Sequence, residues 1–308
     1  LEKNSSEDTV RMRLIAYLAL QITEDPRYIP DLFSGEKYCP TPLSKQEALL
    51  IEQLKGKKLT DPDMPISIQV ECPAWAESKL QELYGDHFDN ELAAMINPAP
   101  LDLRVNTLRG NIKKAQDLLA AQDVCTFKTV YSPVGLRVEG KAYMSATKAF
   151  SKGLVEIQDE GSQLISLLCD VKPGMRVLDY CAGAGGKTLG LAAMMENKGN
   201  ITAMDVDHRR LEKGRKRYRK AGAHNIEVRC LEEEKNRKWL RRQKETMDVV
   251  LVDAPCSSSG TWRRNPDLRW NQYGPSLEEI QIIQADILER ICDKVKIGGR
   301  LVYATCSL

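Results

Sequence analysis

Apolar positions in the first part of the chain recur at helical spacing. Within residues 10–22, four apolar side chains lie three or four positions apart, which predicts an amphipathic helix. A second helix is predicted over residues 44–54, where Ser44 and Glu47 have the spacing of a capping box. Segments that contain prolines follow each helix. Residues 1–70 are therefore expected to form a small helical region.

Residues 71–155 show a mixed pattern. Helical spacing alternates with short runs of apolar and β-branched residues, which are typical of strands. The expected strands cover residues 101–106, 126–130, 136–138 and 154–158, and the expected helices cover residues 73–84, 88–97 and 112–121. Strands and helices mixed over so short a segment predict a compact α+β module.

From residue 156 onward, helices and strands alternate regularly. The expected strands cover residues 176–180, 200–205, 225–230, 247–252 and 300–305, with a turn at Gly298-Gly299 before the last of them. Short, continuously apolar strands of this kind predict an α/β domain with a parallel sheet covered on both faces. Because few strands are recognisable and the last lies at the end of the sequence, residues 156–308 are expected to be a C-terminally incomplete domain.

Composition adds little about partners but excludes some settings. The 308 residues carry a net charge of only +2, so a nucleic-acid site has to be sought in local clusters. No apolar run reaches the roughly 18 residues of a membrane helix. The N-terminal residues lack the pattern of a signal peptide. We expect a cytoplasmic protein without a membrane partner, and a monomer.

Nine cysteines are scattered along the chain, with no CxxC pair and none clustered with the three histidines. This distribution predicts neither a disulfide framework nor a bound metal. Most of the thiols are expected to be small buried apolar groups. Cys256 and Cys306 differ, because they follow the fourth and fifth strands, which are expected to be neighbours. Both thiols would then flank one crevice. The alternative is that they are incidental thiols on loops without a shared role.

The turn after the first strand of the parallel sheet is rich in glycine, with the sequence DYCAGAGGKT at residues 179–188. In an open α/β sheet, ligands bind outside the carboxyl ends of the strands, where glycines allow a close approach. The turn is not a P-loop, because Cys181 stands where a glycine is required. It is not a dinucleotide fingerprint either, because Thr188 replaces the last glycine.

Two carboxylates mark the same crevice. Asp205 ends the second strand and can accept both hydrogen bonds of a ribose diol, although an exposed strand-end aspartate is the alternative. Asp253 ends the fourth strand. A ligand with a ribose, an adenine and a short charged tail fits the turn and these carboxylates better than a dinucleotide does. The pattern therefore points to S-adenosylmethionine.

Four motifs, in this order, resemble the RsmB/NOP2/Sun family of RNA cytosine-C5 methyltransferases: DYCAGAGGKT, MDVD, DAPCSSSGTWRRNPDLRW and GGRLVYATCS. The resemblance covers residues 70–308 and is densest over residues 155–308. The paired PCS and TCS motifs are specific to that family. The branch that methylates bacterial small-subunit ribosomal RNA is the most similar, because PAW at residues 73–75 and LRVNT at residues 103–107 resemble its preceding module.

The resemblance implies a class I methyltransferase fold, Rossmann-like with a mostly parallel sheet, preceded by an RNA-binding module over residues 71–155. It implies methyl transfer from S-adenosylmethionine to C5 of a cytosine in RNA, expected to be ribosomal RNA. Cys306, in the TCS motif, would add to C6 of the base so that C5 can take the methyl group. Cys256, in the PCS motif, would assist release by removing the C5 proton or by otherwise allowing elimination. Asp253 would hydrogen-bond the base near N3.

The resemblance also implies the contacts to the cofactor. Lys187 and the backbone of the turn would bind the methionine moiety, Asp205 would bind the ribose, and Asp253 borders the same site. The turn residues in this set are Cys181, Ala182, Gly183, Ala184, Gly185, Gly186 and Lys187. The family usually places an aspartate near the adenine after the third strand. This chain has Glu232 there, which is one methylene longer.

Basic residues cluster in two places. Eight of the twelve residues 209–220 are lysine or arginine, a run that usually forms a solvated helix face. In the loop after the PCS motif, Arg263, Arg264 and Arg269 are interleaved with two tryptophans. Arginines can bind RNA phosphates, and indoles can stack on bases or anchor the loop. For Trp270, anchoring is expected at least as much as stacking. The expected partner is an unpaired or flipped cytosine, because C6 of a paired base is out of reach.

Two other functions stay open. One is a catalytically weak or inactive member of the same family that binds RNA as an assembly factor, and the replacement of an aspartate by Glu232 keeps it in view. The other is a methyltransferase that acts on a small molecule or a protein amine. Neither function needs two cysteines at neighbouring strand ends. Cys256 and Cys306 therefore favour the RNA cytosine-C5 methyltransferase.

Overall fold

A computed structural model describes residues 8–21, 28–270 and 274–308. The chain divides into two compact units, residues 1–94 and residues 95–308, each described here by itself. The domain boundaries expected from the sequence stay a prediction. No helix within the described ranges is long and apolar enough to cross a membrane.

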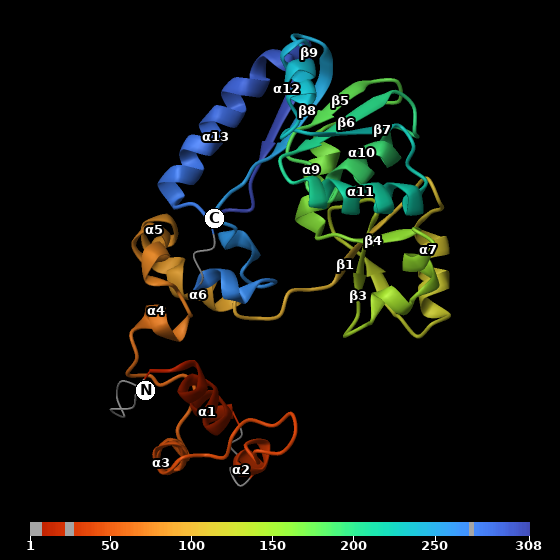
Figure 1. Cartoon of the computed structure of the whole chain (residues 1–308). Helices are drawn as coiled ribbons and strands as arrows, with labels where there is room; N and C mark the ends of the chain where they lie inside the picture. The colour runs from red at the N-terminus through yellow and green to blue at the C-terminus, as the bar shows by residue number, and fades with distance from the viewer. Residues whose placement is uncertain (1–7, 22–27, 271–273) are drawn as a thin grey trace. The chain divides into compact units, whose positions relative to one another are not determined.

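The first unit is helical (Figure 1). Its helices are α1 (Val10–Gln21), α2 (Tyr28–Leu32), α3 (Lys45–Leu54), α4 (Ile66–Gln69), α5 (Ala74–Tyr84) and α6 (Phe88–Ala94). Ile15 of α1 and Leu50 of α3 are buried in one core that α2 also lines. The Ser44 side chain accepts from the Glu47 amide, and the Glu47 carboxylate accepts from the Ser44 amide, so the predicted capping box is confirmed. Residue 22, the last of the first predicted helix, lies outside the described residues.

The second unit begins with an antiparallel sheet of four strands in the order β2-β3-β1-β4. Its strands are β1 (Asp102–Val105), β2 (Thr126–Lys128), β3 (Gly135–Val138) and β4 (Val155–Ile157), and its helices are α7 (Ile112–Ala120) and α8 (Lys148–Ser151). Leu103 of β1, Leu119 of α7 and Leu136 of β3 belong to one buried core. The four strands with α7 and α8 have the mixed α+β character that the sequence predicts, whereas α5 and α6, which were expected in the same module, belong to the first unit.

A parallel sheet of five strands, in the order β7-β6-β5-β8-β9, forms the rest of the unit. Its strands are β5 (Arg176–Asp179), β6 (Asn200–Asp205), β7 (Ile226–Cys230), β8 (Met247–Asp253) and β9 (Val295–Ala304). Its helices are α9 (Glu160–Leu168), α10 (Gly186–Met194), α11 (His208–Ala221), α12 (Glu234–Arg241) and α13 (Leu277–Ile291). Val177 packs in the core with α9, α10 and α11, whereas the next residue, Leu178, packs in the core with α12 and α13 (Figure 1). The sheet is thus covered on both faces, as predicted.

The strand order fixes where a ligand can bind. The chain runs outward from β5 through β6 to β7, and then returns past β5 to β8 and β9. Because the direction of strand addition reverses between β5 and β8, the crevice outside their carboxyl ends is the usual ligand site of such a sheet. The glycine-rich turn follows β5 and the loop with Cys256 follows β8, so both border this crevice.

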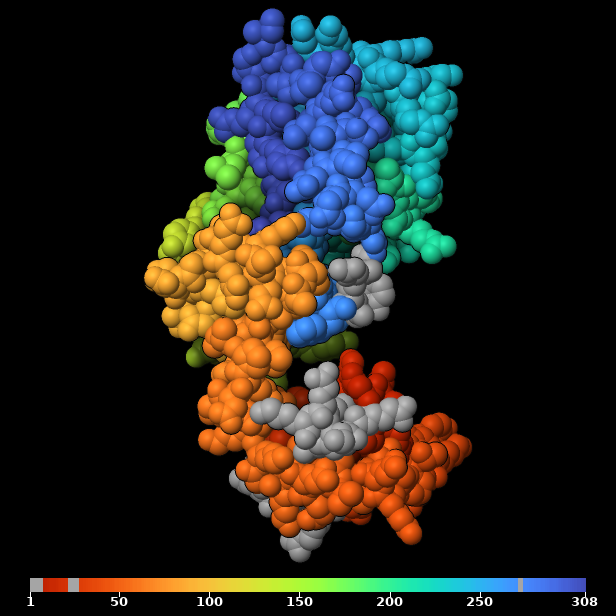
Figure 2. Space-filling view, turned by 90° about the vertical axis from the view of Figure 1, so that its left-hand side faces the viewer, coloured from red at the N-terminus to blue at the C-terminus, as the bar shows by residue number. Residues whose placement is uncertain are grey.

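The last strand differs from its prediction. The sequence predicts a turn at Gly298-Gly299, but β9 runs through both glycines, so this prediction is wrong. The pairing of β9 with β8 shifts register between Met247 and Val249, and the glycines lie in the irregular stretch between the partners of these two residues, Val295 and Arg300. Gly298 has a φ of +77°, which glycine adopts without strain. β9 is an edge strand, and Figure 2 shows its segment, in the darkest blue, at the surface.

Candidate active site

Cys256 and Cys306 lie side by side. Their Sγ atoms are 3.2 Å apart, and the backbone amide of Cys306 donates to Cys256 Sγ at 3.3 Å. Cys256 follows β8 and Cys306 follows β9, and the pairing of these two parallel strands brings their carboxyl ends together. Cys256 is half-buried and Cys306 is exposed. The structure therefore places both predicted thiols at one point of the crevice.

Hydroxyl groups fasten the two cysteine loops to each other. Ser257 Oγ lies 2.9 Å from Ser307 Oγ and 3.0 Å from Ser259 Oγ. The Gly260 amide donates to Cys306 O at 2.8 Å, and a Cβ on Gly260 would stand 2.8 Å from the same oxygen. Sequence reasoning missed this network. The run of serines after Cys256 and the serine after Cys306 were the available signal.

The two thiols share one proton. The pKa of Cys256 is lowered to about 5, first by the hydrogen bond from the Cys306 thiol and then, against the effect of burial, by the amides of Ser258 and Cys306. The same hydrogen bond raises the pKa of Cys306, because a thiol that donates to a neighbouring thiolate resists losing its proton. Cys256, whose sulfur also accepts from the Cys306 amide, is therefore the more acidic thiol of the pair.

The glycine-rich turn needs its glycines. Gly183 and Gly185 have φ values of +55° and +78°. A Cβ on Gly185 would stand 2.2 Å from the hydroxyl of Tyr218, and a Cβ on Gly183 would stand 2.6 Å from a guanidinium nitrogen of Arg210. Tyr218 is buried in the core, so it has little room to move. The backbone of the turn thus lies closer to α11 than any other residue type would allow.

This geometry predicts the effect of Gly185→Ala. The positive φ alone costs an alanine about 1–2 kcal/mol, and the contact with Tyr218 adds an overpacking cost of about 1–3 kcal/mol. Gly174→Ala is the matched control, because Gly174 also has a positive φ, +94°, but nothing within 4 Å of a Cβ. Thermal unfolding is expected to show the larger loss of stability for Gly185→Ala. Equal losses would contradict the contact with Tyr218.

Asp205 is held by the turn itself. The Gly183 amide donates to its Oδ2 at 2.7 Å, and the Asp207 amide donates to its Oδ1 at 2.8 Å. Each carboxylate oxygen keeps a second lone pair for a ligand. Glu232 follows the neighbouring strand β7 and is exposed. The structure therefore places both carboxylates after adjacent strands, as predicted.

Lys187 joins the turn to the cysteine loop. Its Nζ lies 2.6 Å from Asp253 Oδ2, and only 13% of its side chain is exposed. Asp253 ends β8, three residues before Cys256. The ion pair therefore holds a carboxylate between the turn and the cysteine pair.

Asp179 is a member of the site that sequence reasoning missed. It ends β5 and is fully buried, and Thr188 Oγ1 donates to its Oδ2 at 2.6 Å. Its Oδ1 has no hydrogen-bond partner among the described residues. Burial is the main reason why its pKa rises to about 7. An acid directly before a glycine-rich turn was the signal that could have indicated it.

The arginine loop, residues 261–270, is hydrogen-bonded mainly to the segment that precedes β1. Arg263 donates to the carbonyls of Asn97 and Pro98 at 3.1 and 3.0 Å. Arg264 donates to Asp159 Oδ2 at 2.9 Å, and Arg269 donates to Met95 O at 2.9 Å. Arg263 and Arg264 are exposed, whereas Arg269 is buried. Of the three predicted RNA contacts, only the first two have accessible side chains.

The two tryptophans of this loop differ in how far they are exposed. Trp262 is completely buried, and the Arg269 guanidinium lies 5.4 Å from its ring centre. Trp270 is 59% exposed. The anchoring indole is therefore Trp262, and the ring of Trp270 is the one accessible to a base.

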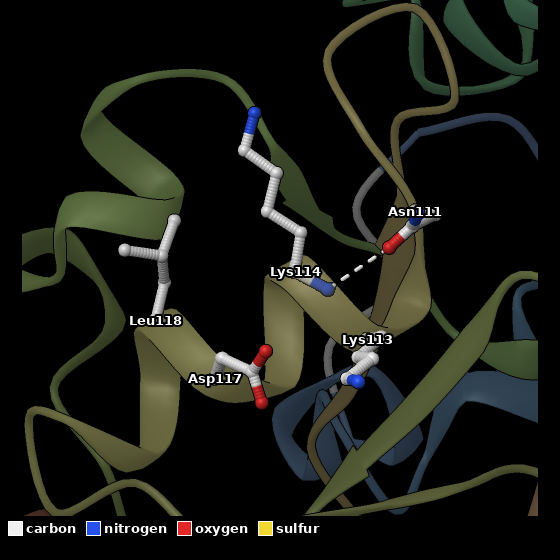
Figure 3. A pocket seen from close by; sticks show the side chains of 5 residues that line it. All are labelled: Asn111, Lys113, Lys114, Asp117 and Leu118. Carbon is white, nitrogen blue, oxygen red and sulfur yellow. Dashed lines mark hydrogen bonds between the residues drawn. The ribbon is translucent and has the colours of Figure 1, made fainter.

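A separate hollow lies on α7, away from these groups. It is lined by Asn111, Lys113, Lys114, Asp117 and Leu118 (Figure 3). The Asn111 side chain accepts from the Lys114 amide at 2.9 Å and so caps the helix. The hollow contains none of the predicted site residues.

Comparison with known proteins bears on the fold and the family. The family model described as 16S rRNA methyltransferase RsmB/F matches residues 166–308, and a model for the ferredoxin-like domain of RsmF/B-like methyltransferases matches residues 72–145. The "Probable ribosomal RNA small subunit methyltransferase B" of Synechocystis sp. (strain ATCC 27184 / PCC 6803 / Kazusa) is 32% identical over 257 residues. That alignment covers 82% of this chain and 57% of the relative. The chain belongs to the RsmB/F methyltransferase family.

Solved structures agree with this assignment. A methyltransferase homolog protein from Pyrococcus horikoshii is 30% identical, with a TM-score of 0.67 over 81% of this chain and 78% of that chain. The crystal structure of PH0851 is 29% identical, with a TM-score of 0.82 over 96% of this chain and 68% of that chain. The predicted class I methyltransferase fold and the predicted family are confirmed. The chain spans about half the length of the curated RsmB/F relatives that it matches.

Proposed function

We propose that this chain transfers a methyl group from S-adenosylmethionine to C5 of a cytosine in RNA. The observation that carries the proposal is the pair of thiols, 3.2 Å apart, at the carboxyl ends of β8 and β9. A second thiol beside the first is of no use to direct methyl transfer, but it suits a reaction in which one cysteine attaches to the base and another helps to release it. The names of the relatives favour small-subunit ribosomal RNA as the substrate.

The residues around the turn fit S-adenosylmethionine. Gly183 and Gly185 carry no side chain, so a ligand can approach the backbone of the turn closely, and Lys187 offers an ammonium group for a carboxylate. In this proposal residues 181–187 hold the methionine moiety, Asp205 the ribose diol and Glu232 the adenosine end, while Asp253 borders the cofactor. When bound, the cofactor supplies an electrophilic methyl group.

The reaction begins at Cys306. Its proton passes to the Cys256 thiolate, 3.2 Å away, as the Cys306 sulfur forms a bond to C6 of the cytosine. The electron pair of the C5–C6 double bond is then available at C5, which takes the methyl group. Asp253 hydrogen-bonds the base near N3, where charge develops.

Release of the product needs two changes at the base. The proton on C5 leaves, the electron pair returns to form the C5–C6 double bond, and the bond between C6 and the Cys306 sulfur breaks. Cys256 is half-buried, so it can first pass its proton to solvent and then, as thiolate, accept the one from C5. The backbone amides of Ser258 and Cys306, which lower the pKa of Cys256 without the Cys306 thiol proton, favour that ionised form.

The RNA-facing part of the proposal is the arginine loop. Arg263 and Arg264 expose their side chains for phosphate contacts, and Trp270 exposes a ring for base stacking. Arg269, which is buried, holds the loop in place through Met95. A cytosine that reaches the cysteine pair has to be unpaired or flipped out of its helix.

Labelled methyl transfer tests the proposed function. The chain is incubated with methyl-labelled S-adenosylmethionine and an unmodified transcript of small-subunit ribosomal RNA, which is then digested to nucleosides. We expect the label in 5-methylcytidine. A transcript made entirely with 5-methylcytosine is the matched control and should take no label. An RNA that binds without gaining 5-methylcytidine would favour the alternative, a non-catalytic RNA-binding assembly factor.

A further inference from the structure

A buried carboxylate lies where the α+β module meets α11. Glu156 is in β4, and only 4% of its side chain is exposed. It accepts from Arg217 at two nitrogens, with distances of 3.2 Å from Nε and 2.9 Å from Nη2. Lys220 Nζ lies 3.4 Å from its other oxygen. Both basic residues belong to α11, so one acid of the module binds two cations of the parallel-sheet domain.

The remaining guanidinium nitrogen of Arg217 contacts the glycine-rich turn. Its Nη1 donates to Ala184 O at 2.7 Å. Arg104, from β1 of the same module, donates to Gly186 O at 2.6 Å and also to Gln158 Oε1. Two guanidinium groups therefore hold two carbonyls of the turn, on either side of Gly185.

Burying an arginine is unfavourable for the fold, so packing alone does not explain why arginines occupy these positions. Arg104 is 4% exposed, and its burial lowers its pKa to about 10. A buried cation that loses its partners is strongly unfavourable, and apolar residues of similar volume often pack as well. What an apolar side chain cannot do is donate to a backbone carbonyl.

The turn needs such donors more than other segments do. Gly183 and Gly185 lack a Cβ, so their backbone can adopt many conformations, and nothing in the glycines themselves selects the observed one. Because a peptide group is planar, fixing the carbonyl of Ala184 fixes the peptide plane that enters Gly185, and fixing the carbonyl of Gly186 fixes the plane between Gly186 and Lys187.

We propose that Arg217 and Arg104 are positioning residues for the cofactor turn, and that Glu156 aligns Arg217 for this role. The α+β module is then part of the cofactor site, although it carries none of the residues expected to contact the cofactor. The inference rests on the proposed function, because the turn is taken to bind S-adenosylmethionine.

The test compares two cations that share Glu156. Arg217→Met removes an ion pair with Glu156 and the contact with Ala184, whereas Lys220→Met removes an ion pair with Glu156 and a ring contact with Phe150 but no contact with the turn. Calorimetric titration with S-adenosylmethionine, without RNA, is expected to show an affinity at least about tenfold lower for Arg217→Met. Lys220→Met should stay within about threefold of the unaltered chain.

Two further variants separate positioning from loss of fold. Arg217→Lys keeps the charge but cannot reach both partners as a planar fork, so we expect partial recovery of affinity. Glu156→Gln keeps the size of the side chain but weakens the alignment of Arg217, and should lower affinity less than Arg217→Met does. Thermal unfolding of each variant, measured without cofactor, shows how much fold stability is lost.

The outcomes distinguish this inference from the proposed function. Equal affinities for Arg217→Met and Lys220→Met would overturn the positioning role and leave the proposed function standing. An unaltered chain that binds no S-adenosylmethionine would overturn the proposed function, and the inference with it. Affinity losses that follow the unfolding temperatures of all four variants, with no excess for Arg217→Met, would also overturn the positioning role.

Discussion

Replacing Cys306 with alanine is expected to stop methyl transfer to RNA, with a rate loss of roughly 10⁴-fold or more, as for removal of other covalent nucleophiles. Without its sulfur, nothing adds to C6, and C5 stays too weak a nucleophile to take the methyl group. The measurement is the initial rate of label incorporation into RNA by the full chain. Cys292→Ala is the control, because Cys292 is also exposed but lies outside the site and should leave the rate unchanged.

The same variant separates chemistry from binding. Cys306 follows β9, whereas the cofactor turn follows β5, so S-adenosylmethionine affinity should stay within about threefold of the unaltered chain. RNA that contains 5-azacytidine should give a covalent complex with the unaltered chain in denaturing gels and none with Cys306→Ala. Equal label incorporation by both proteins would contradict the covalent mechanism.

A second large effect is expected in the pH profile of Cys256. Its pKa is lowered to about 5 from an ordinary 9.0, so the thiolate is present above pH 5 and is lost as the pH falls through that value. The hydrogen bond from Cys306 is the largest cause. In Cys306→Ala the midpoint of Cys256 alkylation should therefore move from about pH 5 toward pH 9.

The midpoint is the informative quantity rather than the rate at one pH. A thiolate of higher pKa is a better nucleophile, with a Brønsted coefficient of about 0.4–0.5. In Cys306→Ala the higher nucleophilicity of Cys256 therefore nearly offsets its smaller thiolate fraction at pH 7, and the alkylation rates of the two proteins are similar there. The rate of alkylation by iodoacetamide is measured over an experimental range of pH 4 to pH 10, and the alkylated cysteine is identified by mass spectrometry. An unchanged midpoint in Cys306→Ala would contradict the shared proton.

The sequence predicted what regular geometry determines. Strands of a parallel sheet end at one edge, so residues that follow neighbouring strands meet, as Cys256 and Cys306 do. The capping box of α3 is local, because Ser44 and Glu47 are three residues apart, and it too was predictable. Gly183 and Gly185 were expected to admit a ligand, which stays a prediction, whereas their close contacts with Arg210 and Tyr218 of α11 are known only from the structure.

Contacts between distant segments decided what the sequence could not. A pair of glycines suits a turn or an irregular strand, and only the pairing with β8 places Gly298-Gly299 inside β9. The burial of Trp262 rather than Trp270 depends on tertiary packing, which two tryptophans in one loop do not reveal. Glu156 and Arg217 are 61 positions apart, so a basic run in a helix gave no indication that one of its members holds the cofactor turn.

The edge position of β9 has a consequence for handling this chain of 308 residues. Among the described residues no strand pairs with its outer side, and Ile297, Leu301 and Tyr303 of this strand have exposed apolar side chains. Unpaired backbone groups beside apolar side chains form a template for a strand from another molecule. Because Cys306 follows this strand directly, a molecule that adds itself at the edge would also restrain the proposed nucleophile. Specific activity is therefore expected to vary with protein concentration, so dilution series belong in every rate measurement.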